Sequence, residues 1–221
     1  MRRLPLLLAA FALLLATLAA SAAKGKASGN LYATIQTGAG NVTVQLFEKE
    51  APIAVKNFVG LATGTKQYRD PKGAKLVEGQ PTDYSKAKWI KGPYYDGILF
   101  HRVIAGFMIQ AGCPFSRNPK FAGQGGPGYG FGVEATPSLR YDRPGRLGMA
   151  HSALPDSNGS QFFITVAPQP SLDGGYTIFG QVVKGQDVVN RISKVATSPT
   201  DRPLKPVAIK HVTVYRSSKP R

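Results

Sequence analysis

The chain has 221 residues, of which 43% are hydrophobic and 18% are charged. This balance excludes an intrinsically disordered protein, because the apolar side chains are numerous enough to form a core. With 25 glycines and 17 prolines and no Gly-X-Y repeat, the composition favours a turn-rich globular fold over a helical bundle or a collagen. Cys113 is the only cysteine, which excludes an intramolecular disulfide and a zinc site built from several cysteines. We expect no metal or other cofactor.

The net charge is +16 at pH 7, from 28 Lys and Arg against 12 Asp and Glu. An excess of this size by itself suggests nucleic acid or a membrane surface as a partner. The sequence has no recognisable nucleic-acid-binding motif, and we expect no nucleic acid partner. We therefore assign the charge to solubility or to a weak attraction toward polyanions of the cell envelope.

The N-terminus has the pattern of a secretory signal peptide. Two arginines precede an apolar run over residues 4–20, and small residues follow where a signal peptidase would cut. We predict a signal peptide over residues 1–23, cleaved near Ala22 or Ala23. The mature protein would be periplasmic or secreted, without stable insertion in a membrane. The alternative is an uncleaved anchor, since the apolar segment is just long enough to span a bilayer.

The first predicted elements after the leader are a hairpin and a helix. A flexible spacer rich in Lys, Gly and Ser (residues 24–30) precedes two runs, 31–37 and 42–47, in which apolar and polar residues alternate. This pattern predicts a β-hairpin. From Pro52 onward apolar residues recur at helical spacing until Gly64, which predicts one amphipathic helix.

Residues 65–91 are rich in Lys, Gly, Pro and Asp and have no clear periodicity, which predicts a long insertion at the surface. Beyond it the sequence predicts a second helix over residues 186–193, a series of short strands and a tail over residues 217–221. The predicted strands cover residues 98–103, 107–111, 146–150, 161–166, 177–183 and 207–215.

About eight short strands and two helices, without a repeat or a second composition regime, predict a single domain over residues 31–216. A closed antiparallel barrel has no exposed strand edges, and helices can then cover its ends. We therefore predict a mainly β fold, namely a closed eight-stranded antiparallel barrel capped by two α-helices.

Two familiar patterns lack the context that their chemistry needs. The glycine run at residues 123–128 has the spacing of a dinucleotide-binding fingerprint, but no apolar strand precedes it and a proline interrupts it. We interpret it as a flexible or tightly turned loop. His151, Ser152 and Asp156 supply the residue types of a hydrolase triad without a nucleophile elbow. Closeness in sequence does not establish a triad, because a triad is assembled by geometry.

The segment over residues 100–110 reads FHRVIAGFMIQ and places polar and apolar groups together. Because side chains on one face of a strand recur every second residue, Met108 and Gln110 share a face. Arg102 joins them across a turn at Gly106. A guanidinium and an amide then lie beside soft apolar groups. The alternative interpretation is an ordinary hairpin whose arginine is solvated.

Further motifs follow in order, and they are MAHS from residue 149, NGSQFF from 158, LDG from 172 and FG from 179. Together with FHRV and GFMIQ they closely resemble the cyclophilin family of peptidyl-prolyl cis-trans isomerases, from about residue 31 to residue 215. The resemblance implies an eight-stranded barrel with a shallow substrate groove on its outer wall. It also implies an enzyme that accelerates rotation about X-Pro peptide bonds without a metal or a nucleotide.

The same resemblance implies two catalytic residues. Arg102 resembles the catalytic arginine, and Gln110 resembles the amide that helps to orient substrate and arginine. The residues implied to bind substrate form the wall of the proline pocket or contact the substrate backbone, and they are Phe107, Met108, Ala150, His151, Phe163, Leu172 and Tyr176. Tyr176 stands where many members carry histidine, and it still offers an aromatic wall with a polar tip.

The chain departs from the family pattern in three segments. Ser171 stands where many members have tryptophan, and we expect weak cyclosporin binding because a large ring and an indole donor are missing. Residues 152–157 form a loop that is one residue longer than in common members, which leaves its register open. The insertion over residues 65–91 has no counterpart in the shortest members. Its Trp89 and its basic residues are candidates for contacts with client proteins, and a mobile surface loop is the alternative.

The sequence thus predicts a monomer that accelerates isomerisation of X-Pro bonds in exported or unfolded proteins. The alternative is a proline-peptide-binding chaperone whose catalysis is incidental. Both functions need the apolar pocket, but only the enzyme needs the arginine for more than affinity.

Overall fold

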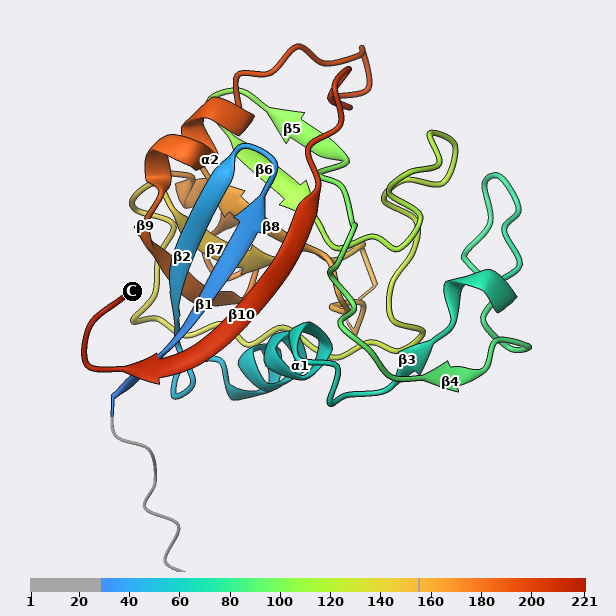
Figure 1. The fold of residues 1–221 in the computed structure, drawn as a ribbon, viewed down its shortest axis with the longest axis horizontal. Coiled ribbons are helices and arrows are strands. Elements are labelled where there is room, and N and C mark those ends of the chain that lie inside the picture. Colours follow the sequence, from blue (N-terminus) through green and yellow to red (C-terminus); the bar gives the residue numbers. More distant parts are fainter. Residues whose placement is uncertain (1–28, 155) are drawn as a thin grey trace, which may run out of the picture.

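The computed structural model describes residues 29–154 and 156–221. The predicted signal peptide over residues 1–23, and most of the predicted spacer after it, lie outside the described residues. Eight strands form one strongly curled antiparallel sheet in the order β10-β1-β2-β9-β7-β8-β6-β5 (Figure 1). These strands are β1 (Asn30–Thr37), β2 (Gly40–Leu46), β5 (Arg102–Ile104), β6 (Met108–Ala111), β7 (Arg146–Met149), β8 (Phe162–Thr165), β9 (Ile178–Lys184) and β10 (Ile209–Ser217).

Two α-helices pack against this sheet, α1 (Pro52–Ala62) and α2 (Gln186–Ile192). Pro52 occupies the first turn of α1, where its missing N–H costs nothing. The carboxylate of Glu134 accepts hydrogen bonds from the N–H groups of Ile53 and Ala54 at 2.9 and 2.7 Å, which satisfies free amides at this helix end. Within the described residues, no helix has the length and apolar character needed to cross a membrane.

The insertion over residues 65–91 has a structure of its own. Strands β3 (Tyr68–Arg69) and β4 (Trp89–Ile90) pair as a small antiparallel sheet, and the 3-10 helix η1 (Pro71–Gly73) follows β3. Figure 1 shows this small sheet beyond α1, beside the curled sheet. A second 3-10 helix, η2 (Pro170–Leu172), precedes β9.

The prediction of a mainly β fold with two α-helices is confirmed, but the prediction of a closed barrel is wrong. In the described part of the chain, no ladder joins β5 to β10. One isolated bridge links Leu99 to Ala208, and the Phe100 N–H donates to the Val207 carbonyl at 2.9 Å. The sheet is therefore an open, strongly curled half-barrel.

The reason for the open edge is the shortness of β5, which has three residues against nine in β10. The Val103 N–H of β5 donates instead to the carbonyl of Asp201, in the loop before β10, at 2.8 Å. The predicted strand over residues 98–103 is wrong over residues 98–101, because β5 starts at Arg102. The other predicted strands and both helices begin and end within two residues of their predicted bounds.

The main core lies between the concave face of the sheet and the helices. Phe58 of α1 is fully buried and contacts three other rings, those of Tyr95, Phe162 and Phe179, at centroid distances of 5.1 to 5.6 Å. A second, smaller cluster of buried residues consists of Met108, Tyr141, Phe163 and Ile178. Partly buried Phe107, Leu172 and Tyr176 pack against this second cluster. The two clusters together hold both faces of β6 and β8 in place.

Candidate active site

The hairpin of β5 and β6 aligns the two polar side chains that the sequence singled out. Arg102 and Gln110 are direct partners in its register. Gly106 has φ of 73° in the connecting turn, a conformation that glycine adopts without strain. The Phe107 N–H closes this turn on the Ile104 carbonyl at 3.1 Å. The guanidinium and the amide consequently project from the same side of the sheet.

Strand β8 adds an aromatic ring beside them, because Phe163 is the register partner of Gln110. The ring of Phe163 lies over Gly148 of β7, where a Cβ atom would come within 2.5 Å of the ring. Any larger residue at position 148 would therefore displace the ring. Tyr141 stacks on Phe163, with ring centroids 5.7 Å apart. The ring of Phe163 is thus fixed by its neighbours.

These side chains surround a small notch of about 130 Å³ on the outer side of the sheet. The residues that line it come from β5, β6, β8 and the loops beside them, and they are Arg102, Phe107, Met108, Gln110, Ala150, His151, Phe163, Leu172 and Tyr176. This set is identical to the nine site residues implied by the sequence resemblance. The structure therefore brings all of them to one place.

Arg102 lies at the rim of the notch, and its side chain is 46% exposed. Its Nη1 atom lies 3.5 Å from Gln110 Oε1, and its Nε atom lies 3.6 Å from Asp201 Oδ2. The Gln110 Nε2 group in turn donates to Gln161 Oε1 at 3.0 Å. Because this bond fixes the Gln110 amide, its oxygen faces Arg102. The guanidinium is held at two points and still has N–H groups free to meet a ligand.

His151 and Tyr176 form the opposite side of the notch. Their rings stack with centroids 4.4 Å apart, and Tyr176 meets the edge of Phe163 at 5.8 Å. The two ring nitrogens of His151 lie 2.7 Å from the Ser152 carbonyl and 2.8 Å from the Gly175 carbonyl. The Ser152 hydroxyl donates to Ser157, so His151 and Ser152 are not arranged as a base and a nucleophile.

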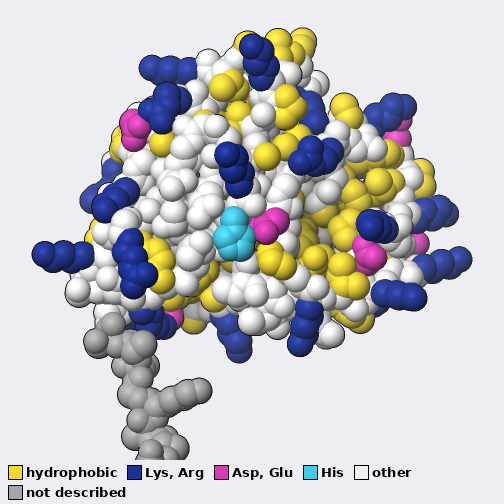
Figure 2. Space-filling model, viewed as in Figure 1, with side chains coloured by type: hydrophobic (Ala, Val, Ile, Leu, Met, Phe, Trp, Pro, Cys, Tyr) yellow, Lys and Arg dark blue, Asp and Glu magenta, His cyan; other side chains and the backbone are white. Residues whose placement is uncertain are grey.

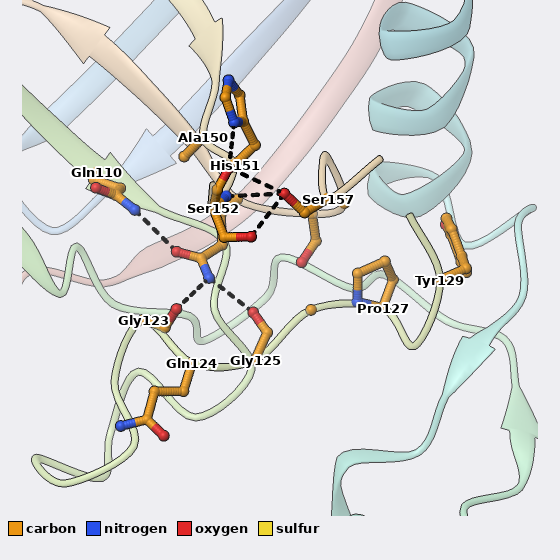
Figure 3. A pocket seen from close by; sticks show the side chains of 14 residues that line it. Gln110, Gly123, Gln124, Gly125, Pro127, Tyr129, Ala150, His151, Ser152 and Ser157 are labelled. Atoms are coloured by element: carbon orange, nitrogen blue, oxygen red, sulfur yellow. Dashed lines mark hydrogen bonds between the residues drawn. The ribbon is translucent and has the colours of Figure 1, made fainter. Parts of the chain in front are cut away.

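A second pocket of about 300 Å³ adjoins the notch, and Figure 3 shows it from close by. The two share Gln110, Ala150 and His151. The far wall is the glycine run at residues 123–128, which folds as a turned loop, as the sequence indicated, and the side chain of Tyr129. The Gln161 Nε2 group donates to the carbonyls of Gly123 and Gly125 at 2.7 and 2.8 Å, so one side chain ties this loop to the sheet.

Comparison with known families gives a match to the model described as "Cyclophilin type peptidyl-prolyl cis-trans isomerase/CLD", over residues 32–214. The chain belongs to the cyclophilin family. It is therefore an enzyme of the peptidyl-prolyl cis-trans isomerase class, and the prediction of this activity from the sequence is confirmed.

Several curated cyclophilins and solved structures are similar to the chain. Peptidyl-prolyl cis-trans isomerase A of Mycobacterium tuberculosis is 46% identical over 184 residues, covering 82% of this chain and 91% of that protein. Peptidyl-prolyl cis-trans isomerase B of Streptomyces anulatus is 43% identical over 187 residues, covering 83% and 96%. A crystal structure of a Cryptosporidium parvum cyclophilin superposes with a TM-score of 0.66 at 30% identity, covering 85% of this chain and 99% of that one.

Sequence reasoning missed two residues that contact the cyclophilin site. Gln161 lies within the NGSQFF motif, and its position beside the notch could have been inferred from that motif. Asp201 lies in the loop before β10, about 100 residues from Arg102 in sequence, and no motif marks it. Its φ of 59° places it in the left-handed region, which Asp tolerates better than most residues. Its contact with Arg102 follows only from the three-dimensional fold.

Replacing Gln161 with Leu should lower the free energy of unfolding by about 1–2 kcal/mol, because the carbonyls of Gly123 and Gly125 lose their donor. The catalytic efficiency kcat/KM should fall several-fold as well, since the Gln110 amide loses its acceptor. Urea unfolding and an isomerisation assay measure the two effects. Gln124→Leu is the matched control, because the exposed side chain of Gln124 bonds only within its own loop, to the Lys120 carbonyl. Equal unfolding midpoints for the two variants would contradict this account.

Proposed function

We propose that this cyclophilin accelerates X-Pro isomerisation in exported or unfolded polypeptides, with Arg102 as the catalytic residue and the notch as the proline site. The observation that carries the assignment of roles is the position of one guanidinium at the rim of an apolar notch. Phe107, Met108 and Phe163 line this notch, and its volume suits a small ring better than a long side chain.

The chemistry of the reaction explains why such a notch is sufficient. Rotation about an X-Pro bond faces a barrier of about 18–20 kcal/mol, because the amide has partial double-bond character. In the twisted transition state conjugation is lost, and the proline nitrogen gains a lone pair that the planar ground states lack. A guanidinium that donates to this lone pair binds the transition state better than either ground state. No bond is broken, so no general base is required.

Arginine alone does not account for a large acceleration. A factor of about 10⁵ corresponds to roughly 7 kcal/mol, whereas a hydrogen bond to a charged group contributes about 1.5–3 kcal/mol. The remainder would come from holding the proline ring while the preceding carbonyl turns, and from moving the amide out of water. Gln110 would orient both the substrate and Arg102 through the contact at 3.5 Å. Ala150, His151, Leu172 and Tyr176 would complete the contacts around the peptide.

An isomerisation assay on a short Ala-Pro peptide tests the proposal, with the protein lacking residues 1–23. A related observation supports this choice of peptide, since the Cryptosporidium parvum cyclophilin has also been solved in the presence of the dipeptide Ala-Pro, with a TM-score of 0.65 to this chain. We expect exchange far faster than in buffer. Exchange at the uncatalysed rate would overturn the proposed function.

The proposed substrates follow from the predicted signal peptide, which would direct the protein to the periplasm or the exterior. Sequencing of the N-terminus of the exported protein should begin at Ala23 or Lys24, and an intact N-terminus in the membrane fraction would favour an anchor instead. We also propose that the mature protein is a monomer that does not bind nucleic acid. Size-exclusion chromatography at the mass of one chain, and absence of DNA binding at physiological salt, are the expected results.

Cyclosporin should inhibit this protein weakly, well above the nanomolar range. Ser171 is exposed on η2, beside Leu172 of the notch, and it offers neither a large ring nor an indole N–H to the inhibitor. Inhibition curves for the wild-type protein and for Ser171→Trp measure the effect, and the variant should be inhibited more tightly. Nanomolar inhibition of the wild-type protein would contradict the prediction.

A further inference from the structure

The insertion over residues 65–91 is anchored to the loop that walls the second pocket. The Arg69 N–H donates to the Pro127 carbonyl at 2.9 Å, and the Thr82 hydroxyl donates to the Gln124 carbonyl at 2.9 Å. The Tyr84 hydroxyl donates to the Gly126 carbonyl and accepts from the Gly126 N–H, at 2.8 and 3.1 Å. The insertion is therefore attached at several points to the substrate side of the molecule.

Four side chains of the insertion and the pocket form a continuous stack, which we call the cation–aromatic strip (Lys66, Arg69, Trp89 and Tyr129). Arg69 and Trp89 are cross-strand partners of β3 and β4, and the guanidinium carbon lies 4.2 Å from the centre of the Trp89 ring. Trp89 stacks on Tyr129, with centroids 6.3 Å apart and planes 25° apart. The Lys66 ammonium lies over Tyr129, 4.3 Å from its centre. Each contact is of a favourable type.

The strip begins where the second pocket ends. Tyr129 lines that pocket, and Figure 3 shows it at the side nearest α1, across the pocket from Gln110. Asn57 of α1 fixes this corner, because its Oδ1 atom accepts from Lys66 Nζ at 2.8 Å and from the Tyr129 hydroxyl at 2.9 Å. Its Nδ2 group donates to the Gly159 carbonyl, on the pocket wall, at 2.7 Å. A peptide that continues through the second pocket would therefore reach the strip.

The charge of the strip is positive and uncompensated. In the part of the chain that the structure describes, neither Lys66 nor Arg69 forms an ion pair with a carboxylate. Burial, and next the positive charge of Lys56, lower the pKa of Lys66. The carboxylate of Asp70, next to Arg69, accepts from the Lys72 N–H. Figure 2 shows hydrophobic surface among many basic and fewer acidic side chains on one face of the molecule.

We propose that the cation–aromatic strip binds an acidic segment of the same substrate polypeptide whose X-Pro bond lies in the notch. This inference rests on the proposed function and adds a preference for substrates with Asp or Glu at a distance from the proline. Trp89 is 45% exposed, so the exposed part of its ring can pack on the apolar parts of such a segment. The two cations supply the complementary charge, with the modest strength expected at a surface.

The kinetic test uses a series of peptides that each contain one Ala-Pro bond and one pair of Glu residues. The pair stands at a different position in each peptide, on either side of the proline, and each peptide has a counterpart with Gln in place of Glu. At low salt we expect kcat/KM for the best-placed Glu peptide to exceed that of its Gln counterpart about three- to tenfold, with the ratio falling toward one in high salt. The ratio should also fall toward one in Lys66→Gln/Arg69→Gln. It should persist in Lys72→Gln/Lys75→Gln, which removes two exposed lysines of the same insertion outside the strip.

The outcomes separate the two proposals. Failure to isomerise any peptide would overturn the proposed function, whereas equal rates for Glu and Gln peptides at every position would overturn only the acidic-segment proposal. A Glu-to-Gln ratio of kcat/KM that is unchanged in Lys66→Gln/Arg69→Gln would also overturn the acidic-segment proposal. Each ratio compares the Glu and Gln peptides on the same variant. A general loss of folding therefore lowers the rates for both peptides and leaves their ratio interpretable.

A direct binding measurement uses the fluorescence of Trp89, the only tryptophan of the chain. Titration with a Glu peptide that lacks aromatic residues should change the emission saturably, and the Gln peptide should not. A single-stranded oligonucleotide serves as the competing ligand, since bases stack on exposed aromatic rings. If the oligonucleotide quenches Trp89 and the Glu peptide has no effect, the acidic-segment proposal is wrong.

Discussion

Replacing Arg102 with Ala should lower kcat/KM for an Ala-Pro peptide about 10- to 100-fold, while the affinity for the peptide changes only a few-fold. The expected factor corresponds to one hydrogen bond from a charged donor, about 1.5–3 kcal/mol, because a tenfold change in rate equals about 1.36 kcal/mol. Turnover should carry the loss, since the proposed role of the guanidinium is to donate to a nitrogen lone pair that exists only in the twisted state. Exchange spectroscopy by NMR measures the rate, and titration of the same peptide measures the affinity.

Two further variants define what the Arg102 result means. Arg102→Lys keeps the charge without the planar fork, and it should recover only part of the rate. Arg191→Ala removes an exposed arginine of α2 that lies outside the notch, and it should retain full activity. If Arg102→Ala loses affinity and turnover in equal measure, the arginine serves binding alone. The chaperone with incidental catalysis would then be the better description.

Two kinds of sequence signal led to the residues of the notch, namely the local geometry of one hairpin and the resemblance to a family. Arg102 and Gln110 lie on one hairpin, so the two-residue period of a strand and the turn at Gly106 determine that they face each other. Phe163 joins them through a strand-to-strand register that no period predicts, and here the family resemblance supplied the contact. All nine residues line one notch, and their assignment as site residues stays a prediction that the variants above test.

The closure of the sheet could not be predicted from the same sequence. Ile98, Leu99 and Phe100 are apolar and buried, as residues of a strand would be, yet they form only a bridge and single hydrogen bonds. The burial of a segment determines which of its residues are apolar. Whether the segment also pairs as a strand depends on the path of a distant part of the chain, which here is the loop that carries Asp201. A closed barrel and an open half-barrel with a covered edge therefore have the same hydrophobic pattern.

The insertion was unpredictable for a related reason. Its pairs span large separations in sequence, such as Arg69 with Trp89 and Lys66 with Tyr129, and its strands are two residues long. Periodicity needs longer segments than these to be detected. The expectation that Trp89 and basic residues would contact client proteins stays a prediction. The structure adds the feature that makes it testable, namely the attachment of this insertion to the second pocket.

A second large effect concerns His101, which is 5% exposed and directly precedes Arg102. Burial lowers the pKa of His101 to about 4, and the positive charges of Arg202 and Arg102 act in the same direction. In the unfolded chain the imidazole has its ordinary pKa of about 6.5. Between these two values the unfolded state binds a proton that the folded state does not bind. Lowering the pH through this range therefore favours unfolding, and raising it above 6.5 restores the stability.

The free energy of unfolding should fall by up to about 3 kcal/mol from this residue alone as the pH drops from about 6.5 to 4, at no more than about 1.4 kcal/mol per pH unit. Urea unfolding at successive pH values measures the slope. Carboxylates add their own dependence in the acidic part of the range, so the informative quantity is the difference in slope between the wild-type protein and His101→Gln. This variant has no group that titrates at position 101, and it should have a smaller slope even if its stability at pH 7 is lower.

The control variant for this measurement is His211→Gln, because His211 is half-exposed and pairs with Asp96 at the surface. Its replacement should leave most of the slope between pH 6.5 and 4 in place. Identical slopes for the wild-type protein and His101→Gln would contradict the prediction, since they would mean that the imidazole gains its proton equally in both states. A reduced slope in His101→Gln alone would instead identify His101, beside Arg102, as the group whose burial makes this fold sensitive to acid.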